Sequence, residues 1–301
     1  MYKHEYIKTL NYSALKSFIQ CPRRYFTEYL YKEFPKAYSP NLVAGMGVHA
    51  GFEEIMKRKR DNVSVSDSVI EKIILKEIDN QIENIREDGF LFEEQAIRKI
   101  KEEAVNIVLQ NKRHINDIFG SFSEIEGIEY QFYAPIPGIP EHILFHCRID
   151  LITRLGDVYS IWDYKTVNTF WGSEKKRHLE GYTAQLLLYK YFYSIHKQID
   201  PSVIRTFFLL FRKRDCAVEK WQSFYTHADL KRFLSYFSIM YEMLKNFSFP
   251  PVQEISIQNC KFCPAYNEEK NLCSMVDVDT KKYILEHYNV EEFQQQGEKH
   301  E

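Results

Sequence analysis

The sequence has no long apolar run, little glycine or proline, and almost no net charge. Its 301 residues include only 11 Gly and 10 Pro, which excludes collagen-like and low-complexity chains. None of its apolar stretches approaches the roughly 20 residues that a membrane-spanning helix needs. The opening residues, MYKHEYIKTLNYSALKSF, lack the apolar segment and cleavage site of a signal peptide. We therefore expect a cytoplasmic protein that does not bind a membrane.

Charges of the two signs nearly cancel, because 40 Lys and Arg residues are matched by 42 Asp and Glu residues. A net charge of −2 excludes a simple polycationic nucleic-acid coat, but it permits an enzyme that presents basic groups on one face. Local basic clusters occur, such as Lys57–Arg60, and their default interpretation is a solvated face. Hydrophobic residues make up 45% of the chain, which is ample for a packed core.

The six cysteines divide into four candidate ligands and two expected core residues. The candidates are a C-x2-C-x9-C trio and one residue in an N-terminal segment: Cys260, Cys263, Cys273 and Cys21. Four thiolates suit either zinc or an iron–sulfur cluster, and their spacing does not decide between the two. Cys147 and Cys216 lie in or beside apolar, strand-like runs, so we expect them to be inert.

The pattern of apolar residues predicts helices, then a β-meander, then a helix, strands and a final helix. Expected helices cover residues 13–31, a stretch starting near Gly47, 67–119 with a break at Gly89, 179–196 and 229–247. Expected strands cover 123–134, 143–154, 157–166, 203–212 and 218–225. This order favours an α/β fold in which helices flank a central mixed sheet.

Two strands carry acidic residues among apolar neighbours. Asp163 and Lys165 end the run IWDYK, and the alternation of a strand places both on one face. Asp150 lies in the preceding strand, RIDLI, where a lone buried carboxylate is costly unless a cation accompanies it. Paired carboxylates suit Mg²⁺ or Mn²⁺. The alternative is a salt bridge to Lys165 inside the sheet.

These motifs together resemble the PD-(D/E)xK nuclease superfamily, in particular its RecB/AddB-type branch and CRISPR-associated relatives. HCRID ends at Asp150 and WDYK ends at Lys165, as in the active-site hairpin of that family. An upstream helical histidine matches His49, and the family's Q-x-x-x-Y matches Gln185 to Tyr189. The resemblance runs from about residue 12 to residue 275.

The resemblance implies a restriction-endonuclease-like fold with a [4Fe-4S] cluster joining N- and C-terminal segments. It implies one nuclease domain over residues 1–275, a helical insertion at about 67–119, and a tail over 276–301. Iron–sulfur members of the branch bind their cluster through one cysteine before the core and three after it. This layout matches Cys21, Cys260, Cys263 and Cys273.

The resemblance also assigns roles to the site. The implied ligands of Mg²⁺ or Mn²⁺ are His49, Asp150, Asp163 and the backbone carbonyl of Tyr164. Lys165 would position the attacking water, and Gln185 and Tyr189 would line the phosphate or a displaced strand. Glu129 is a further candidate acid, with Glu126 as its competitor.

The expected activity is that of a metal-dependent DNA nuclease, more an exonuclease on single strands or ends than an endonuclease. Implied partners are DNA and a helicase, a recombinase or a CRISPR integrase. The alternative is a non-catalytic DNA-binding or assembly subunit that keeps the cluster and works with a helicase or integrase. A redox-sensing iron–sulfur regulator is a third hypothesis, which the intact hairpin disfavours.

Overall fold

The structure is a computed structural model that describes residues 4–31, 38–171, 180–251, 260, 263, 265–267 and 272–291. The chain divides into two compact units. The terminal unit comprises Met1–Ala37, Tyr133–His146 and Thr226–Glu301, and the central unit comprises Tyr38–Phe132 and Cys147–Tyr225. Among the described residues, no helix combines the length and the apolar character that crossing a membrane requires.

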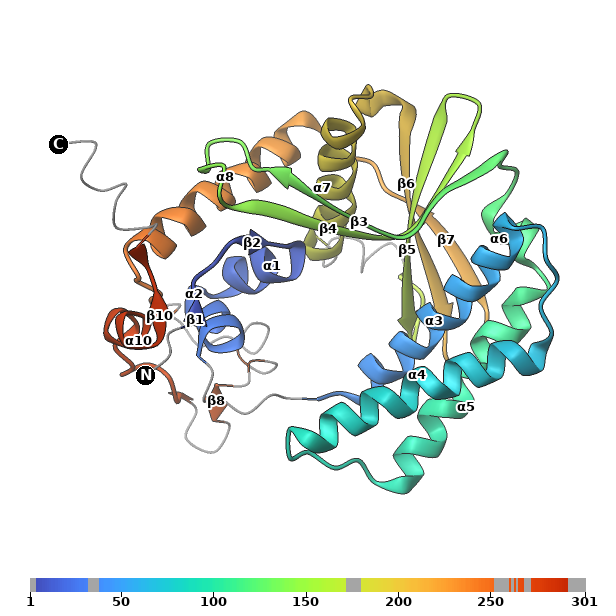
Figure 1. The fold of residues 1–301 in the computed structure, drawn as a ribbon, viewed down its shortest axis with the longest axis horizontal. Coiled ribbons are helices and arrows are strands. Elements are labelled where there is room, and N and C mark those ends of the chain that lie inside the picture. Colours follow the sequence, from blue (N-terminus) through green and yellow to red (C-terminus); the bar gives the residue numbers. More distant parts are fainter. Residues whose placement is uncertain are drawn as a thin grey trace. The chain divides into compact units, whose positions relative to one another are not determined.

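The central unit holds a helical layer and most of a sheet (Figure 1). Its helices are α3 (Pro40–Arg60), α4 (Asp67–Glu87), α5 (Glu94–Lys112), α6 (Ile115–Phe119), α7 (Glu180–Lys197) and the 3-10 turn η3 (Pro201–Val203). Its strands are β5 (Val158–Val167), β6 (Ile204–Arg212) and β7 (Val218–Gln222). Strands β3 (Glu124–Pro135) and β4 (Leu144–Leu155) have residues in both units.

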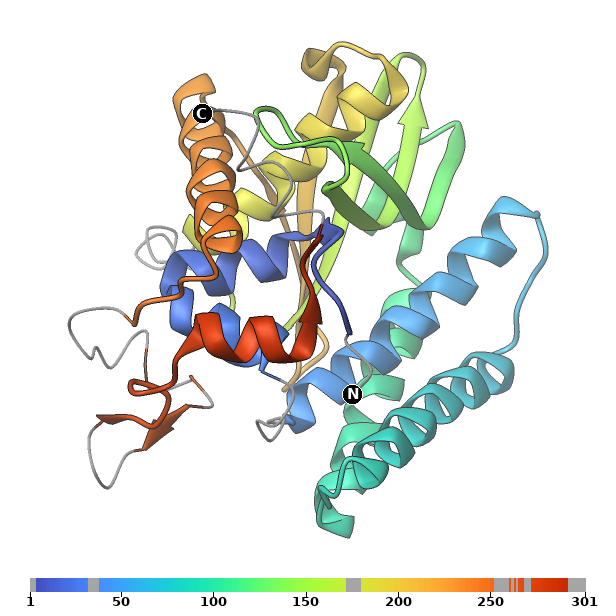
Figure 2. The same cartoon turned by 60° about the vertical axis from the view of Figure 1, so that its left-hand side comes forward.

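The terminal unit takes its helices from the two ends of the sequence, and it also includes the internal segment Tyr133–His146 (Figure 2). Its helices are α1 (Tyr12–Gln20), α2 (Pro22–Tyr25), the π-helical turn η1 (Phe26–Leu30), α8 (His227–Lys245) and α10 (Thr280–His287). Its strands are β1 (His4–Glu5), β2 (Thr9–Leu10), β8 (Tyr266–Asn267), β9 (Leu272–Cys273) and β10 (Tyr288–Asn289).

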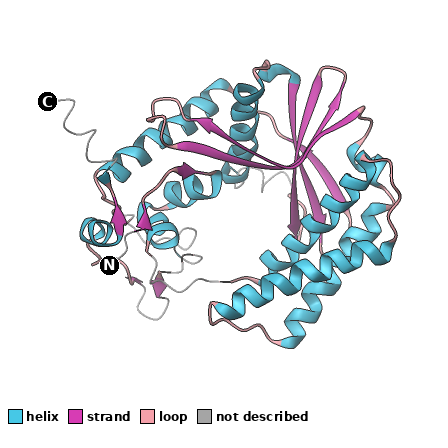
Figure 3. Cartoon of the chain, viewed as in Figure 1, coloured by secondary structure: helices cyan, strands magenta, loops and turns pink. Residues whose placement is uncertain are grey.

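The main sheet is mixed, with strand order β2-β4-β5-β6-β7 and β3 paired with β4 (Figure 3). β4 and β5 form an antiparallel hairpin whose turn contains Gly156 at φ +58°, the left-handed region that favours glycine. β6 runs parallel to β5 and antiparallel to β7. The crossover from β5 to β6 passes through α7. The predicted α/β architecture with a helix-flanked mixed sheet is therefore confirmed.

Helices α3 and α7 serve opposite faces of strand β5. Tyr164 packs against Phe52 of α3, with ring centroids 5.4 Å apart. Its neighbour Asp163 instead accepts a hydrogen bond from Gln185 of α7. Because side chains alternate along a strand, one strand thus contributes an apolar surface to α3 and a polar one to α7.

Helix α3 begins earlier than the sequence indicates. The predicted start near Gly47 is wrong: the helix begins at Pro40, capped by the Ser39 side chain. The glycines instead allow close packing against α4 and α5. A Cβ at Gly47 would lie 2.8 Å from Ile78, and one at Gly51 would lie 2.9 Å from Val108.

The helical stretch 67–119 forms α4, α5 and α6, with α4 and α5 separated by a turn at Gly89, φ +84°. α4 directs one stripe of isoleucines inward, namely Ile70, Ile74, Ile78, Ile82 and Ile85. α5 matches it with Ile100, Ala104, Ile107 and Val108. All of these residues belong to one buried cluster that also includes Trp162 and Tyr164 of β5. The expected helices over 67–119, with their break at Gly89, are therefore confirmed.

The terminal unit has an aromatic core that joins the two ends of the chain. The expected helix over 13–31 is interrupted at Cys21, whose extended backbone separates α1 from α2. Phe26 stacks against Phe249 and meets Tyr283 edge-on, with centroids 5.8 and 5.7 Å apart. Tyr288 donates a 2.6 Å hydrogen bond to the Leu30 carbonyl. Residues expected to form a tail thus include a packed helix, α10, and strand β10.

Candidate active site

The site begins where strands β4 and β5 separate. Their regular pairing ends at Leu151 opposite Trp162, and the next residues on the two strands are Asp150 and Asp163. Beyond that point, the Tyr164 backbone N–H donates a 2.7 Å hydrogen bond to the Asp150 carboxylate, where a paired strand would offer a backbone carbonyl. Both aspartates are buried. The hairpin therefore holds two acidic side chains at the point where the sheet opens.

Helix α3 brings His49 to the same place. Its Nε2 lies 3.2 Å from the Tyr164 carbonyl oxygen, and its Nδ1 lies 3.5 Å from Asp150 Oδ1. Nδ1 also lies 3.7 Å from Glu129 Oε1 of β3. One ligand atom each from His49, Glu129 and Asp150 falls within 4.8 Å of the others. This trio, which we call the acidic cluster, is the one group of its kind in the described part of the chain.

Glu129 enters the acidic cluster through an unusual backbone conformation. Its φ of +46° lies in the left-handed region, which non-glycine residues rarely adopt inside a strand. Its other carboxylate oxygen accepts a 2.6 Å bond from Arg148 Nε. Glu126, its competitor in the sequence, instead forms a 2.7 Å ion pair with Arg154. The structure thus favours Glu129. Arg148, which the sequence analysis missed, lies two residues before Asp150 on the same strand.

Asp163 lies beside the acidic cluster and has a different set of partners. Its Oδ2 lies 2.5 Å from Lys165 Nζ, and its Oδ1 accepts a 2.8 Å bond from Gln185 Nε2. Gln185 also donates to the Tyr189 hydroxyl at 3.0 Å, one helical turn further along α7. The residues predicted for the hairpin and for α7 are therefore brought together. Asp163, however, does not belong to the compact trio.

The electrostatics of the two aspartates differ. Burial raises the pKa of Asp163 to about 6; the Lys165 ammonium opposes that rise and the Asp150 carboxylate adds to it. Burial also acts to raise the pKa of Asp150, but His49, Lys165 and the Tyr164 N–H hold it below its usual value. Asp150 is thus the firmly ionised member of the pair.

His49 supplies positive charge to the carboxylates around it. Burial acts to lower its pKa, but the Asp150 carboxylate and hydrogen bonds to Asp150 and Glu129 override this effect and raise it to about 10. The imidazolium and a divalent cation are therefore alternative ways to neutralise the same acids.

The donor set of the acidic cluster fits a divalent metal. Two carboxylates and an imidazole nitrogen converge on one place, and Asp163 lies next to them. The Tyr164 carbonyl is a further donor nearby, on the Nε2 side of the His49 ring. Carboxylate and carbonyl oxygens suit Mg²⁺ and Mn²⁺, and the imidazole favours Mn²⁺ as well. Such a cation would replace the imidazolium proton and neutralise the buried charge.

The four candidate cysteines belong to the terminal unit, and Cys273 interacts electrostatically with the other three. All are partly exposed free thiols. Burial raises the pKa of Cys273, and the neighbouring Cys21 and Cys260 raise it further. Burial likewise raises the pKa of Cys263 to about 11, with a contribution from Cys273. Cys147 and Cys216 are buried elsewhere, in the central unit.

Comparison with known proteins identifies the family. Residues 9–267 match the model of the PD-(D/E)XK nuclease superfamily. A comparison with curated proteins gives no match. A Eubacterium rectale protein named "Putative exonuclease" has a similar fold, with 13% identity, a TM-score of 0.53, and coverage of 81% of this chain and 84% of that one. A structure named SSO0001 shares 14% identity over 88% of this chain and 85% of its own, with a TM-score of 0.40. The family match covers most of the sequence, and the chain belongs to the PD-(D/E)XK nuclease superfamily.

Proposed function

We propose that the protein is a metal-dependent deoxyribonuclease that hydrolyses phosphodiester bonds at the opening of the β4–β5 hairpin. The observation that carries the proposal is the convergence of His49, Glu129 and Asp150 beside the Asp163–Lys165 pair. Membership of the nuclease superfamily supplies the DNA substrate class. A hydrolase of this kind needs charge neutralisation at the phosphate, a positioned water and a stabilised leaving oxygen.

Each side chain has a distinct part in this proposal. His49, Asp150, Asp163 and the Tyr164 carbonyl would hold Mg²⁺ or Mn²⁺, with Glu129 as a further ligand. When bound, the metal supplies Lewis-acid stabilisation of the phosphate and of the attacking water. Lys165, a quarter exposed, would orient the water and stabilise developing negative charge.

Residues on α7 act through Asp163. Gln185 donates to the Asp163 carboxylate and to the Tyr189 hydroxyl, so it fixes the rotamer of the aspartate. This contact favours a positioning role for Gln185 and Tyr189 in addition to the expected contact with the phosphate or displaced strand. A buried carboxylate held at both oxygens has little freedom to turn away from a cation.

We extend the proposal to exonuclease action on single strands or ends. The Eubacterium rectale protein of similar fold carries the name exonuclease, which favours this mode over endonuclease action. A helicase, recombinase or CRISPR integrase in the cytoplasm would supply such strands. These finer points rest on the RecB/AddB-type resemblance.

The test is cleavage of end-labelled single-stranded DNA by the purified full chain with Mn²⁺ or Mg²⁺. Asp163→Asn and Lys165→Met should each abolish cleavage without changing the melting temperature by more than a few degrees. Asp157→Asn is the matched control, because Asp157 is an exposed acid in the turn of the same hairpin. Equal cleavage by the wild type and Lys165→Met would overturn the assignment. A folded wild type that binds DNA but does not cleave it would favour the assembly-subunit alternative.

We also propose that Cys21, Cys260, Cys263 and Cys273 bind a [4Fe-4S] cluster within the terminal unit. The proximity of the four thiols supports a shared site. One cysteine lies before the nuclease core and three follow it, as in the iron–sulfur members of the RecB/AddB-type branch. This layout favours a cluster over zinc in the proposal.

Protein purified without oxygen tests this second part independently of nuclease activity. We expect a brown protein with visible absorbance, whose iron content falls on Cys273→Ser and stays unchanged on Cys216→Ser. Because the cluster would link segments far apart in sequence, its loss should also lower the melting temperature. A colourless protein that contains zinc would contradict the cluster and leave the nuclease proposal standing.

A further inference from the structure

The basic run at the end of α3 contains two cations that the helix itself does not neutralise. Lys57 pairs with Glu53 at 2.7 Å and Arg58 pairs with Glu54 at 2.6 Å, each across one helical turn. The residues one turn before Lys59 and Arg60 are the buried, apolar Ile55 and Met56.

Lys59 therefore forms no salt bridge within the described residues. Arg60 is paired there with the adjacent Asp61 alone, at 3.3 Å, and both side chains of that pair are about half exposed. Of the four cations, Lys59 thus lacks a carboxylate partner in the described part of the chain, and Arg60 has only a half-exposed one.

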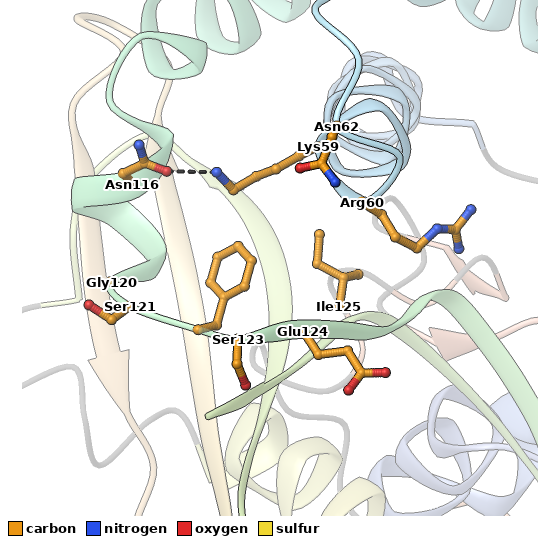
Figure 4. Close-up of a pocket in the computed structure, with 10 residues that line it drawn as sticks. Lys59, Arg60, Asn62, Asn116, Gly120, Ser121, Ser123, Glu124 and Ile125 are labelled. Atoms are coloured by element: carbon orange, nitrogen blue, oxygen red, sulfur yellow. Dashed lines mark hydrogen bonds between the residues drawn. The ribbon is translucent and has the colours of Figure 1, made fainter. Parts of the chain in front are cut away.

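Both cations line a cavity of about 600 Å³ in the central unit, which we call the α3–α6 pocket (Figure 4). Lys59 reaches across from α3 and donates a 2.8 Å hydrogen bond to Asn116 Oδ1 of α6. Its ammonium also lies 5.4 Å from the centroid of the half-buried Phe122 ring. Ser121 and Ser123 lie on the segment that leads into β3. The pocket therefore combines cations, amide and hydroxyl groups, and one aromatic face.

This combination suits a nucleic-acid strand. Lysine and arginine neutralise backbone phosphates, and aromatic faces stack on bases without regard to sequence. One acid, Glu124, also lines the pocket, but its carboxylate is in an ion pair with Arg154. Arg60 has Asp61 as its partner, so Lys59 is the charged lining residue without a carboxylate partner in the described part of the chain.

Two elements connect the α3–α6 pocket to the acidic cluster. Lys59 follows His49 on α3 by ten residues, which is about 15 Å of helix at roughly 1.5 Å per residue. β3 joins the same two places, since Ile125 lines the pocket and Glu129 belongs to the cluster. At about 3.4 Å per stacked nucleotide, 15 Å corresponds to about four to five nucleotides.

We propose that the α3–α6 pocket is a second DNA-strand site, which holds the backbone about four to five nucleotides from the bond that is cleaved. Lys59 and Arg60 bind phosphates, and Phe122 stacks on a base. The proposal rests on the nuclease function proposed above and adds the path that the substrate follows across the central unit. The proposal also predicts that cleavage depends on substrate length, because a strand too short to reach the pocket cannot bind there.

The test compares Lys59→Gln/Arg60→Gln with the matched control Lys57→Gln/Arg58→Gln. Both variants remove two charges from the same helix end, so they alter the interaction with the helix dipole equally. We measure kcat/KM with Mn²⁺ on single strands of about three and about twelve nucleotides, lengths that fall short of and pass the pocket. Lys59→Gln/Arg60→Gln should lower the value for the longer strand about tenfold, with no change for the shorter one and little effect in the control.

Binding of the longer strand in EDTA, where no cleavage occurs, gives a second readout. Lys59→Gln/Arg60→Gln should weaken binding and reduce the slope of log K against log salt by about 1.4, which is about 0.7 for each lost phosphate contact on a single strand. Phe122→Leu keeps the packing apolar, and it should weaken binding about tenfold without changing that slope.

The outcomes separate this proposal from the nuclease assignment. Equal losses in both double variants, or none in either, would overturn the pocket while leaving cleavage by the wild type intact. A wild type that cleaves nothing, together with a binding defect specific to Lys59→Gln/Arg60→Gln, would overturn the nuclease proposal and retain the DNA site.

Discussion

The β4–β5 hairpin and the α3–α4–α5 layer are both buried parts of the central unit, and opposite kinds of interaction hold them. Asp150 and Asp163 sit in the hairpin with polar partners at 2.5–2.8 Å, from a backbone N–H, an ammonium and an amide. The helical layer instead buries stripes of isoleucine, alanine and valine against glycines. One region depends on paired charge, and the other depends on shape.

The difference between the two regions indicates which residues serve catalysis and which serve the stability of the fold. Burying two carboxylates is unfavourable by several kcal/mol unless partners compensate, so a chain that served only to fold would do better with apolar residues there. The helical layer carries no such conflict of charge, because the buried stripes of α4 and α5 contain no ionisable residue. Substitutions in the hairpin should therefore change activity most, and substitutions at the inward-facing apolar and glycine positions of the layer should change stability alone.

Asp150 gives the largest expected effect, because it combines both kinds of role. Asp150→Ala should lower cleavage at least about a hundredfold, as loss of a preorganised charged group commonly does. It also leaves the buried Tyr164 N–H without its acceptor, which should lower the free energy of unfolding by about 1–3 kcal/mol.

Asp150→Asn separates these two roles. The amide oxygen can still accept the Tyr164 N–H, so denaturant unfolding should show a smaller loss of stability than in Asp150→Ala. Cleavage should fall as far as in Asp150→Ala, since the negative charge is gone. If Asp150→Asn retained activity near that of the wild type, the carboxylate would not be a metal ligand.

The sequence predicted the hairpin because its acids conflict with their surroundings. An aspartate in RIDLI and another in IWDYK stand out among apolar residues, and alternation alone places Asp163 and Lys165 together. The helices over 67–119 were equally predictable, since apolar residues that recur with a period near 3.6 over several turns indicate a helix. Both kinds of prediction used local patterns, and the structure places these residues in the elements that those patterns imply.

Features that depend on distant contacts were not readable. Glycines in α3 suggested a late helix start, whereas they lie inside the helix because Ile78 and Val108 leave no room for a side chain. The choice between Glu126 and Glu129 depends on the positive φ at Glu129, which breaks the alternation of β3. No local sequence pattern predicts the break in alternation at Glu129, so the sequence alone could not decide between Glu126 and Glu129.

Glu129 should give the next largest effect, on metal binding. Glu129→Gln removes one carboxylate from the acidic cluster, and we expect the affinity for Mn²⁺ to fall about tenfold to a hundredfold. Glu126→Gln is the matched control on the same strand, because its carboxylate pairs with Arg154 outside the cluster. Isothermal titration of metal-free protein with Mn²⁺ measures both. Equal losses in the two variants would show that Glu129 acts only through overall charge.

The smallest expected effect belongs to the helical layer, where Gly51→Ala tests packing alone. The new Cβ would lie 2.9 Å from both methyl groups of Val108 and 3.0 Å from Ile74. Because Val108 is β-branched, its side chain has few allowed χ1 rotamers and cannot easily move aside. We therefore expect a loss of about 1–2 kcal/mol in unfolding free energy. Gly45→Ala on the same helix meets only Thr166 Oγ1 at 3.7 Å, and it should stabilise the protein by up to about 1 kcal/mol through helix propensity.

If Gly51→Ala lowers the free energy of unfolding and Gly45→Ala raises it, the space beside each glycine, and not the flexibility of glycine itself, determines the stability of α3. Adding Val108→Ala to Gly51→Ala should recover part of the loss, so that the double variant is more stable than the sum of the two single changes predicts. Cleavage per folded molecule should stay at the wild-type level throughout, since none of these side chains touches the acidic cluster. A drop in cleavage at unchanged stability would instead mean that the close approach of α3 to α5 sets the position of His49, and the two regions would not be separable.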